Sequence, residues 1–461
     1  MFADILLPLR NVARNRRRTL ITLITTAVGC IALLIFGGYA AAVVHGVETG
    51  VVRQAGHLQV QRKNYFLVGT GDPGNFGIAD YKSLMHIIEN DRVVKPNLRV
   101  ITPILQLQGI AGNFENGVSR TISGYGYIPH DQNVMRTWNE YRFPDRPRAV
   151  PIPEGASDVV SVGIGVARNL HLCSALNEVR CKDVDLPARK TGPAAPADIV
   201  ALAKSEPPPP QRPGVHIDLL AATANGAPNV VNARVIGAES LGIKEIDDTY
   251  LAMPLSLAQQ LVYGHGSRPQ VTALELQLKR SAQIETVTRR LNELIRSNGW
   301  DLEVLDYATL YPAYKQIKGL FASIFGFVAT LIGVVVLFSV ANTMGSAVME
   351  RTVEIGTLRS MGVSRFGIAG QFLTEGLLIG VIGTGVGTVL ALLCAWVINT
   401  SGLTWTPPNS IDAIPLVVHT FNSPWLIVGT IAALVILAAL SSVLPAVRAA
   451  RLPVVEALRH V

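Results

Sequence analysis

The sequence predicts a polytopic α-helical membrane protein with four transmembrane helices (1 + 3) and a large extracytoplasmic α/β domain between the first and second helices. Of its 461 residues, 49% are hydrophobic and 16% are charged, which is more apolar than an average soluble protein. The hydrophobic residues concentrate in four blocks, each long enough for the roughly 20 residues that cross a bilayer core. Between the first two blocks, about 270 residues alternate strand and helix patterns.

The chain begins with a basic segment, residues 1–18. Phe2, Ile5 and Leu9 recur there at helical spacing, which predicts a short interfacial helix, with a frayed basic tail as the alternative. The first transmembrane helix follows at residues 19–44. A signal peptide is the rival interpretation, but this apolar run is longer than the roughly 7–15 residues of a signal-peptide core. We therefore expect an uncleaved span.

Residues 45–314 are expected to form an α/β domain of two subdomains. Strands are predicted at 57–61, 98–110, 118–122, 159–162, 230–236, 272–278 and 302–305. Helices are predicted at 81–88, 255–262 and 284–297. A proline-rich insertion at about 177–213 separates the two groups; it predicts an exposed spacer, with a partner-docking segment as the alternative.

Two small motifs lie in this domain. Gly163 and Gly165 follow a predicted strand and match half of a dinucleotide-binding fingerprint, but the third glycine and the acidic partner are missing, so a glycine turn is favoured. Cys173 and Cys181 lie in an oxidising location, and we expect a disulfide between them, with two free thiols as the alternative. No second Cys or His pair stands at metal-ligand spacing, which argues against a zinc site.

The second transmembrane helix and its stalk occupy residues 315–349, and a polar segment at 350–366 follows. In this segment Ile355, Leu358 and Met361 can share one helical face. A helix lying passively on lipid is one interpretation. However, carboxylates such as Glu354 would be repelled by an anionic membrane surface, so we favour docking into a protein groove with apolar and basic walls.

The third transmembrane helix, residues 367–399, carries a stripe of small residues. Its members are Gly376, Gly380, Gly383 and Gly387. Small residues four apart let helix backbones approach closely, either within one subunit or between subunits. Glu375 is the only charge of this helix, and a snorkelling or paired carboxylate near Arg365 is the expected role.

The basic residues near the ends of the helices predict the orientation. The loop at 400–424, before the fourth helix at 425–447, contains no Lys or Arg. The N-terminal segment, the 350–366 segment and the tail at 448–461 all carry arginines. Both termini should therefore be cytoplasmic. Much of the net charge of +7 lies beside the apolar blocks, so no nucleic-acid partner is expected.

Catalytic motifs are missing from the sequence. It contains no G-x-x-x-x-G-K-[ST] phosphate-binding loop, no H-E-x-x-H zinc motif and no G-x-S-x-G nucleophile motif. We therefore expect neither an enzyme nor a bound cofactor in this chain.

Several stretches resemble one permease family. They are MERTVEIGTLRSMGVSRFGI, FLTEGLLIG, the tail LPAVRAARLPVVEALRHV and, more loosely, VVSVGIGVARNLHL. The chain is similar in these stretches to the family that includes MacB, LolC, LolE and FtsX. The resemblance implies a bacterial inner-membrane permease of an ABC transporter that works as a dimer, with a second copy or a homologue. A separate cytoplasmic ATPase subunit would bind ATP and Mg, and its closure would move the periplasmic domain by mechanotransmission.

The resemblance also implies that the 350–366 segment docks on the ATPase. The implied coupling residues are Glu350, Arg351, Val353, Glu354, Ile355, Gly356, Leu358, Arg359 and Met361. Expected cargoes are a lipoprotein, lipid, peptide or drug, with a periplasmic adaptor or acceptor as a further partner. The layout is closer to LolC or LolE than to MacB, which has a fused nucleotide-binding domain. Alternatives are an FtsX-like protein that activates a cell-wall hydrolase, and a receptor without an ATPase.

The predicted topology can be tested with single cysteines in a chain that lacks the native ones. Because the domain at 45–314 is expected outside, an impermeant maleimide should label Ser267→Cys in intact cells and leave Ser360→Cys unlabelled. Labelling of Ser360→Cys but not of Ser267→Cys would reverse the orientation.

Overall fold

The computed structural model describes residues 16–114, 116–144, 147–178, 181–183, 213–264, 268–406 and 413–453. The chain divides into two compact units. The membrane unit comprises Met1–Val47, Ala313–Trp405 and Ile414–Val461, and the sheet unit comprises Glu48–Pro312 and Thr406–Ala413. The predicted interfacial helix at 1–18 and most of the 177–213 insertion lie outside the described residues.

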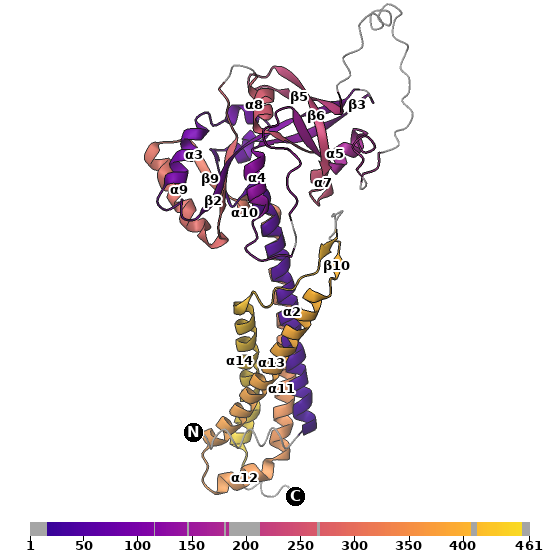
Figure 1. The fold of residues 1–461 in the computed structure, drawn as a ribbon. Coiled ribbons are helices and arrows are strands. Elements are labelled where there is room, and N and C mark those ends of the chain that lie inside the picture. Colours follow the sequence, from indigo (N-terminus) through magenta and orange to yellow (C-terminus); the bar gives the residue numbers. More distant parts are fainter. Residues whose placement is uncertain are drawn as a thin grey trace, which may run out of the picture. The chain divides into compact units, whose positions relative to one another are not determined.

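Long helices make up the membrane unit (Figure 1). They are α2 (Arg16–Ala55), which continues into the sheet unit, α11 (Pro312–Glu350), α13 (Arg365–Thr400) and α14 (Pro424–Arg451). A short helix, α12 (Thr352–Ser360), stands between α11 and α13, and a two-stranded pair, β10 (Thr404–Trp405) and β11 (Ile414–Pro415), precedes α14. Within the described residues, four helices are long and apolar enough to cross a membrane. These four helices contain the four predicted spans and support a membrane protein.

The small-residue stripe of α13 packs on two different helices. A Cβ at Gly376 would lie 2.6 Å from the Ser442 side chain of α14, and one at Gly387 would lie 2.7 Å from the Ala27 carbonyl oxygen of α2. Gly380 faces Ala438 of α14 in the same way, and Gly383 faces Thr26 of α2. These contacts within one chain leave no room for side chains, so the stripe holds α13 against both neighbours.

Within the described residues, the sheet unit contains nine strands in the order β3-β7-β4-β6-β5-β2-β8-β1-β9, with an additional β2–β3 pairing. Their bounds are β1 Leu58–Arg62, β2 Leu98–Asn113, β3 Val118–Tyr127, β4 Val159–Gly163, β5 Val215–Ala222, β6 Pro228–Glu239, β7 Tyr250–Pro254, β8 Ala273–Leu278 and β9 Leu302–Asp306. Because β2 pairs with both β3 and β5, six strands close into a ring. The first half of β2 extends this ring into a four-stranded antiparallel sheet with β8, β1 and β9.

Short helices surround the strands (Figure 1). Their bounds are η1 Tyr65–Gly69, η2 Pro73–Phe76, α3 Tyr81–Asn90, α4 Pro129–Arg136, α5 Ile164–Asn169, α7 Lys244–Asp247, α8 Leu255–Tyr263, η3 Ser281–Gln283, α9 Ile284–Asn298 and α10 Tyr307–Leu310. We predicted two subdomains. In the structure the six-stranded ring and the four-stranded sheet share β2, and one hydrophobic cluster extends through both.

The four-stranded sheet is buried on both faces. Leu274, Leu276 and Leu278 of β8 belong to the cluster that includes residues of α3 and α9. On the opposite face, the Gln277 side chain donates to the Val52 carbonyl oxygen of α2 and the Met135 carbonyl oxygen of α4, each at 3.0 Å. Alternation along a strand places these polar residues away from the leucines. The end of α2 and helix α4 therefore cover a polar sheet face.

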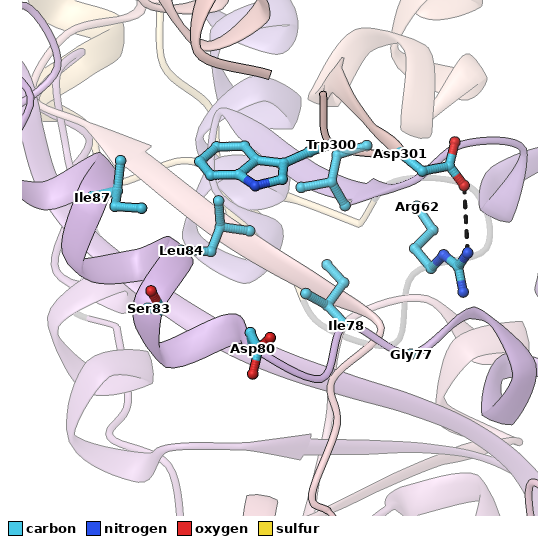
Figure 2. A pocket seen from close by; sticks show the side chains of 10 residues that line it. Arg62, Gly77, Ile78, Asp80, Ser83, Leu84, Ile87, Trp300 and Asp301 are labelled. Atoms are coloured by element: carbon cyan, nitrogen blue, oxygen red, sulfur yellow. Dashed lines mark hydrogen bonds and ion pairs between the residues drawn. The ribbon is translucent and has the colours of Figure 1, made fainter. Parts of the chain in front are cut away.

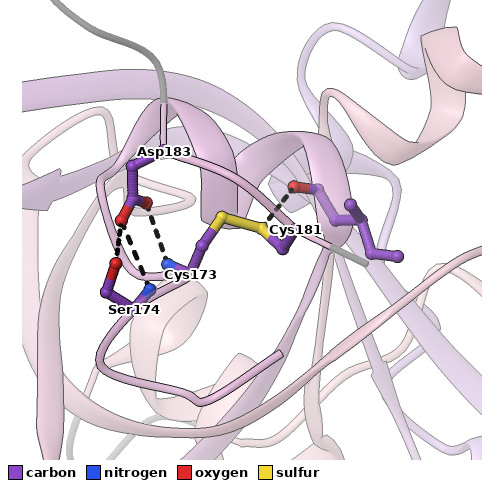
Figure 3. The surroundings of a disulfide bond; sticks show 5 residues. Cys173, Ser174, Cys181 and Asp183 are labelled. Carbon is purple, nitrogen blue, oxygen red and sulfur yellow. Dashed lines mark hydrogen bonds between the residues drawn. A yellow bond between two sulfur atoms is a disulfide. The ribbon is translucent and has the colours of Figure 1, made fainter. Parts of the chain in front are cut away.

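Cys173 and Cys181 form a disulfide in the structure (Figure 3). The Asp183 carboxylate accepts hydrogen bonds from the Cys173 and Ser174 backbone amides at 3.0 and 3.3 Å. It also accepts one from the Ser174 hydroxyl at 2.6 Å. The disulfide and the Asp183 carboxylate together close a small loop shortly after α5.

We expect this disulfide in the native protein. Peptide mass spectrometry without reduction, on membranes alkylated when fresh, should find Cys173 linked to Cys181, with the exposed Cys394 alkylated as the internal control. The chain-entropy model assigns about 2–3 kcal/mol to so small a loop. Recovery of both Cys173 and Cys181 as alkylated thiols would contradict the prediction.

Candidate functional site

The candidate site is α12 and the ion pairs that hold it. Helix α11 ends at Glu350, and Arg351 caps α12. The Thr352 hydroxyl donates to the Val348 and Met349 carbonyl oxygens at 3.2 and 2.9 Å, and so satisfies the exposed end of α11. Gly362 ends α12 at φ +95°, a conformation that glycine adopts without strain. The chain can therefore turn sharply on both sides of α12.

Arg351 is the centre of the site. Its Nη1 atom lies 2.9 Å from Glu375 Oε1 of α13, and its Nε atom lies 3.1 Å from Glu354 Oε2 of α12. The guanidinium carbon lies 5.8 Å from the centroid of the Phe372 ring, within cation–π range. The exposed fraction of the side chain is 13% for Arg351 and 4% for Glu375. A planar guanidinium thus joins the α11–α12 turn, α12 itself and α13.

This arrangement gives Glu375 a partner that the sequence pattern did not indicate. We expected a snorkelling or paired carboxylate near Arg365, but the paired residue is Arg351. The pair joins two different helices across the α12–α13 turn, whereas sequence spacing reveals only neighbours along one helix. A second ion pair, Arg18–Glu350 at 2.7 Å, joins α2 to the end of α11 and is about half exposed.

The inner face of α12 packs on the membrane unit. Ile355 is 3% exposed and belongs to the hydrophobic cluster that contains Val348, Ile368 and Phe372. Gly356 is buried as well, and Leu358 packs against the same cluster. Arg359 is half-buried. This differs from the predicted arrangement, in which Ile355 and Leu358 fill a groove of a partner.

The outer face of α12 carries different residues. Val353 is 47% exposed and Met361 is 68% exposed, and Thr357 between them is exposed too. Phe366, just after the turn into α13, is 91% exposed. A helix rotates about 100° per residue, so Val353, Thr357 and Met361 lie along one side. We call Val353, Thr357, Met361 and Phe366 the outer face of α12; sequence reasoning identified Val353 and Met361 but not Phe366.

A separate cavity of about 380 Å³ lies in the sheet unit (Figure 2). Trp300, Leu84 and Ile87 form part of its apolar lining. Arg62 also lines it and is joined to Asp301 by an ion pair of 3.4 Å. Arg62 and Asp301 thus balance each other's charge, and Asp80 is the third charged residue of the lining. Within the described residues, no group of three His, Cys, Asp or Glu side chains is placed to hold a metal ion.

Comparison with known proteins identifies the part of the chain that contains α12. Residues 326–454 match the family described as FtsX-like permease C-terminal. These residues are an FtsX-like permease domain. The domain includes Arg351, Glu354 and Glu375, so the ion-paired cluster lies inside it. The family predicted from the sequence motifs thus matches over these residues, and the match and the four apolar helices of the described residues support a multi-pass membrane protein.

Curated relatives of this chain are named as transport proteins. The lipoprotein-releasing system transmembrane protein LolC of Xylella fastidiosa is 27% identical over 247 residues, covering 50% of this chain and 56% of that protein. The pyoverdine export ATP-binding/permease protein PvdT of Pseudomonas syringae pv. tomato is 26% identical over 211 residues, 46% of this chain and 30% of that protein.

A third relative is the macrolide export ATP-binding/permease protein MacB of Bdellovibrio bacteriovorus. It is 28% identical over 189 residues, 38% of this chain and 28% of that protein. The chain therefore spans between 28% and 56% of the length of these three curated relatives.

The ion pair can be tested by a double-mutant cycle. Arg351→Met leaves Glu375 buried without its cation, which should cost about 3–5 kcal/mol of stability. The double variant Arg351→Met/Glu375→Leu should recover most of that loss, because neither charge remains. Unfolding can be followed as the labelling of buried Cys30 by a maleimide in a Cys394→Ser chain, since Cys394 is exposed.

The matched control is Arg18→Met, which removes the half-exposed pair with Glu350. That change should cost about 0–1 kcal/mol. If Arg351→Met unfolds at the same temperature as Arg18→Met, the Arg351–Glu375 pair does not hold α12.

Proposed function

We propose that this chain is the permease subunit of an ABC transporter and that α12 is its coupling helix. In this proposal a separate cytoplasmic ATPase subunit binds ATP and Mg and docks on α12. Its closure moves the membrane helices and, through them, the sheet unit on the periplasmic side. That motion drives the export or release of a lipoprotein, lipid, peptide or drug without passage of the cargo through this chain.

The observation that carries the proposal is the attachment of α12 on both sides. Arg351 joins α12 to α13 through Glu375, and the chain continues directly from α11 into α12. A displacement of α12 is therefore passed to two membrane helices at once. Helix α11 runs from Pro312 to Glu350, so one uninterrupted helix leads from the sheet unit to α12. A helix of that length is a suitable lever.

The outer face of α12 is the proposed contact with the ATPase. Its apolar members, Val353, Met361 and Phe366, are 47%, 68% and 91% exposed. The inner residues Ile355 and Leu358 then have a different role from the one predicted, since they fix α12 to its own membrane unit. Glu354 and Arg351 likewise act within the chain, by setting the direction of α12.

The remaining parts of the proposal follow from the family and the charges. The names of PvdT and MacB join an ATP-binding part to a permease, which supports an ATPase partner for this chain. Basic residues at the α2 start, around α12 and at the α14 end support a cytoplasmic location of these parts in a bacterial inner membrane. We further propose a dimer with a second copy or a homologue.

The docking face can be separated from folding by one substitution. Met361→Asp places a charge on the exposed outer face, where it leaves the chain's own core intact but is buried without a partner on docking. We expect co-purification with the ATPase and the stimulation of ATP hydrolysis to fall at least tenfold. The unfolding temperature should stay unchanged.

Leu403→Asp is the matched control, because Leu403 is also apolar and 54% exposed but follows α13 at its other end. It should bind the ATPase like the parent. Leu358→Asp, by contrast, should lower stability as well as docking, since Leu358 packs on the core. If Met361→Asp copurifies and stimulates ATP hydrolysis like Leu403→Asp, α12 is not the coupling helix.

A further inference from the structure

A second cavity of the sheet unit, of about 200 Å³, contains an unusual carboxylate. Glu275 of β8 lines it and is 1% exposed. Its Oε1 atom accepts a hydrogen bond from the Gln59 side chain of β1 at 3.0 Å. Its Oε2 atom is buried and has no hydrogen-bond partner. Such an atom is costly to bury unless something in the cavity satisfies it.

A second unsatisfied acceptor lines the same cavity. The Gln132 side-chain nitrogen donates to the Arg53 and Gln54 carbonyl oxygens at 3.5 and 3.3 Å. These bonds fix the orientation of the amide, and its Oε1 atom is buried without a partner. Gln132 belongs to α4, so the two acceptors come from the sheet and from the helix that covers its polar face. The Tyr127 hydroxyl also lines the cavity and is likewise buried without a partner, so neither acceptor receives a hydrogen bond from the lining.

Aromatic rings complete the lining. The Tyr125 and Tyr250 rings are stacked with centroids 5.5 Å apart, and Tyr127 and Tyr311 line the cavity as well. The face of an aromatic ring attracts cations. None of the described residues that line this cavity is Lys, Arg or His. Acceptors, ring faces and a carboxylate together select a positively charged donor.

We propose that this cavity binds a primary ammonium group on a short aliphatic chain, with Glu275 as its counter-ion and Gln132 as a second acceptor. An ammonium has three N–H donors, enough for both orphan oxygens and one more contact. The volume corresponds to about seven water molecules at about 30 Å³ each, so only a small group fits. A free alkylamine and the side chain of a lysine in a polypeptide share this chemistry.

The ionisation of Glu275 adds a pH dependence. Burial raises the pKa of Glu275 to about 8, and the hydrogen bond from Gln59 lowers it by less. Tyr125 and Tyr311 face Glu275, and burial raises their pKa values as well, so they stay neutral. The other carboxylate in the lining is Glu245. Since the ammonium needs the carboxylate form, binding below pH 8 should release a proton, and the affinity should rise about tenfold for each unit by which the pH increases toward 8.

The test uses the full chain in detergent and needs no ATPase, so its outcome is independent of the coupling proposal. n-Butylamine should bind in isothermal titration at pH 7, and n-butanol should not. Glu275→Gln keeps an acceptor for Gln59 but removes the charge, and it should weaken butylamine at least tenfold. The matched control is Glu303→Gln, because Glu303 accepts from Gln61 at 3.0 Å on the neighbouring strands and does not line the cavity.

A capped lysine distinguishes the two sources. If Nα-acetyl-lysine methylamide binds at least tenfold more tightly than butylamine, the natural ligand is a lysine side chain; equal or weaker binding assigns a free amine. Either result supports the site, provided Glu275→Gln weakens it. The proposal is overturned if neither amine binds, which would leave ordered water in the cavity, or if Glu275→Gln and Glu303→Gln bind butylamine alike.

Discussion

The membrane unit depends on one buried ion pair. Arg351 and Glu375 are removed from solvent together, and each is costly to bury alone, so one side chain requires the other. Replacing such a pair by apolar residues is often neutral for stability. Its particular contribution here is direction: a planar guanidinium bound to Glu354 as well as Glu375 permits one orientation of α12 relative to α13. The outward direction of Val353 and Met361 follows from it.

Helix α13 connects the ion pair to the other membrane helices. The same helix that carries Glu375 lies against α14 through Gly376 and Gly380, and against α2 through Gly383 and Gly387. Its backbone is in close contact with both neighbours, and a packed interface transmits displacement because it has few alternative arrangements. The proposed coupling therefore requires no special hinge in the membrane helices.

Sequence reasoning succeeded where a signal is local. The spans follow from uncharged runs such as the one from Gly319 to Met349, and the glycine stripe predicted close packing. It could not identify the helices that the glycine stripe contacts, because residue spacing shows which side of α13 is packed but not which helix packs against it. The Arg351–Glu375 and Gln59–Glu275 contacts join residues 24 and 216 positions apart, which no periodicity reveals. Strands β5 and β7 were not predicted, although β7 is as completely buried as the predicted strands β4 and β8.

The central claim is that ATP binding by the partner displaces the sheet unit through α12. Spin labels at Lys82→Cys in the sheet unit and Ser401→Cys in the membrane unit report this displacement directly. The labelled chain has Cys30 and Cys394 replaced by serine, and it is diluted with unlabelled chains so that only distances within one chain are measured. Pulsed EPR distances should shift by several ångströms when ATP is added with the ATPase, and Met361→Asp should abolish the shift. An unchanged distance distribution in the labelled parent, with the ATPase bound and hydrolysing, would contradict the account.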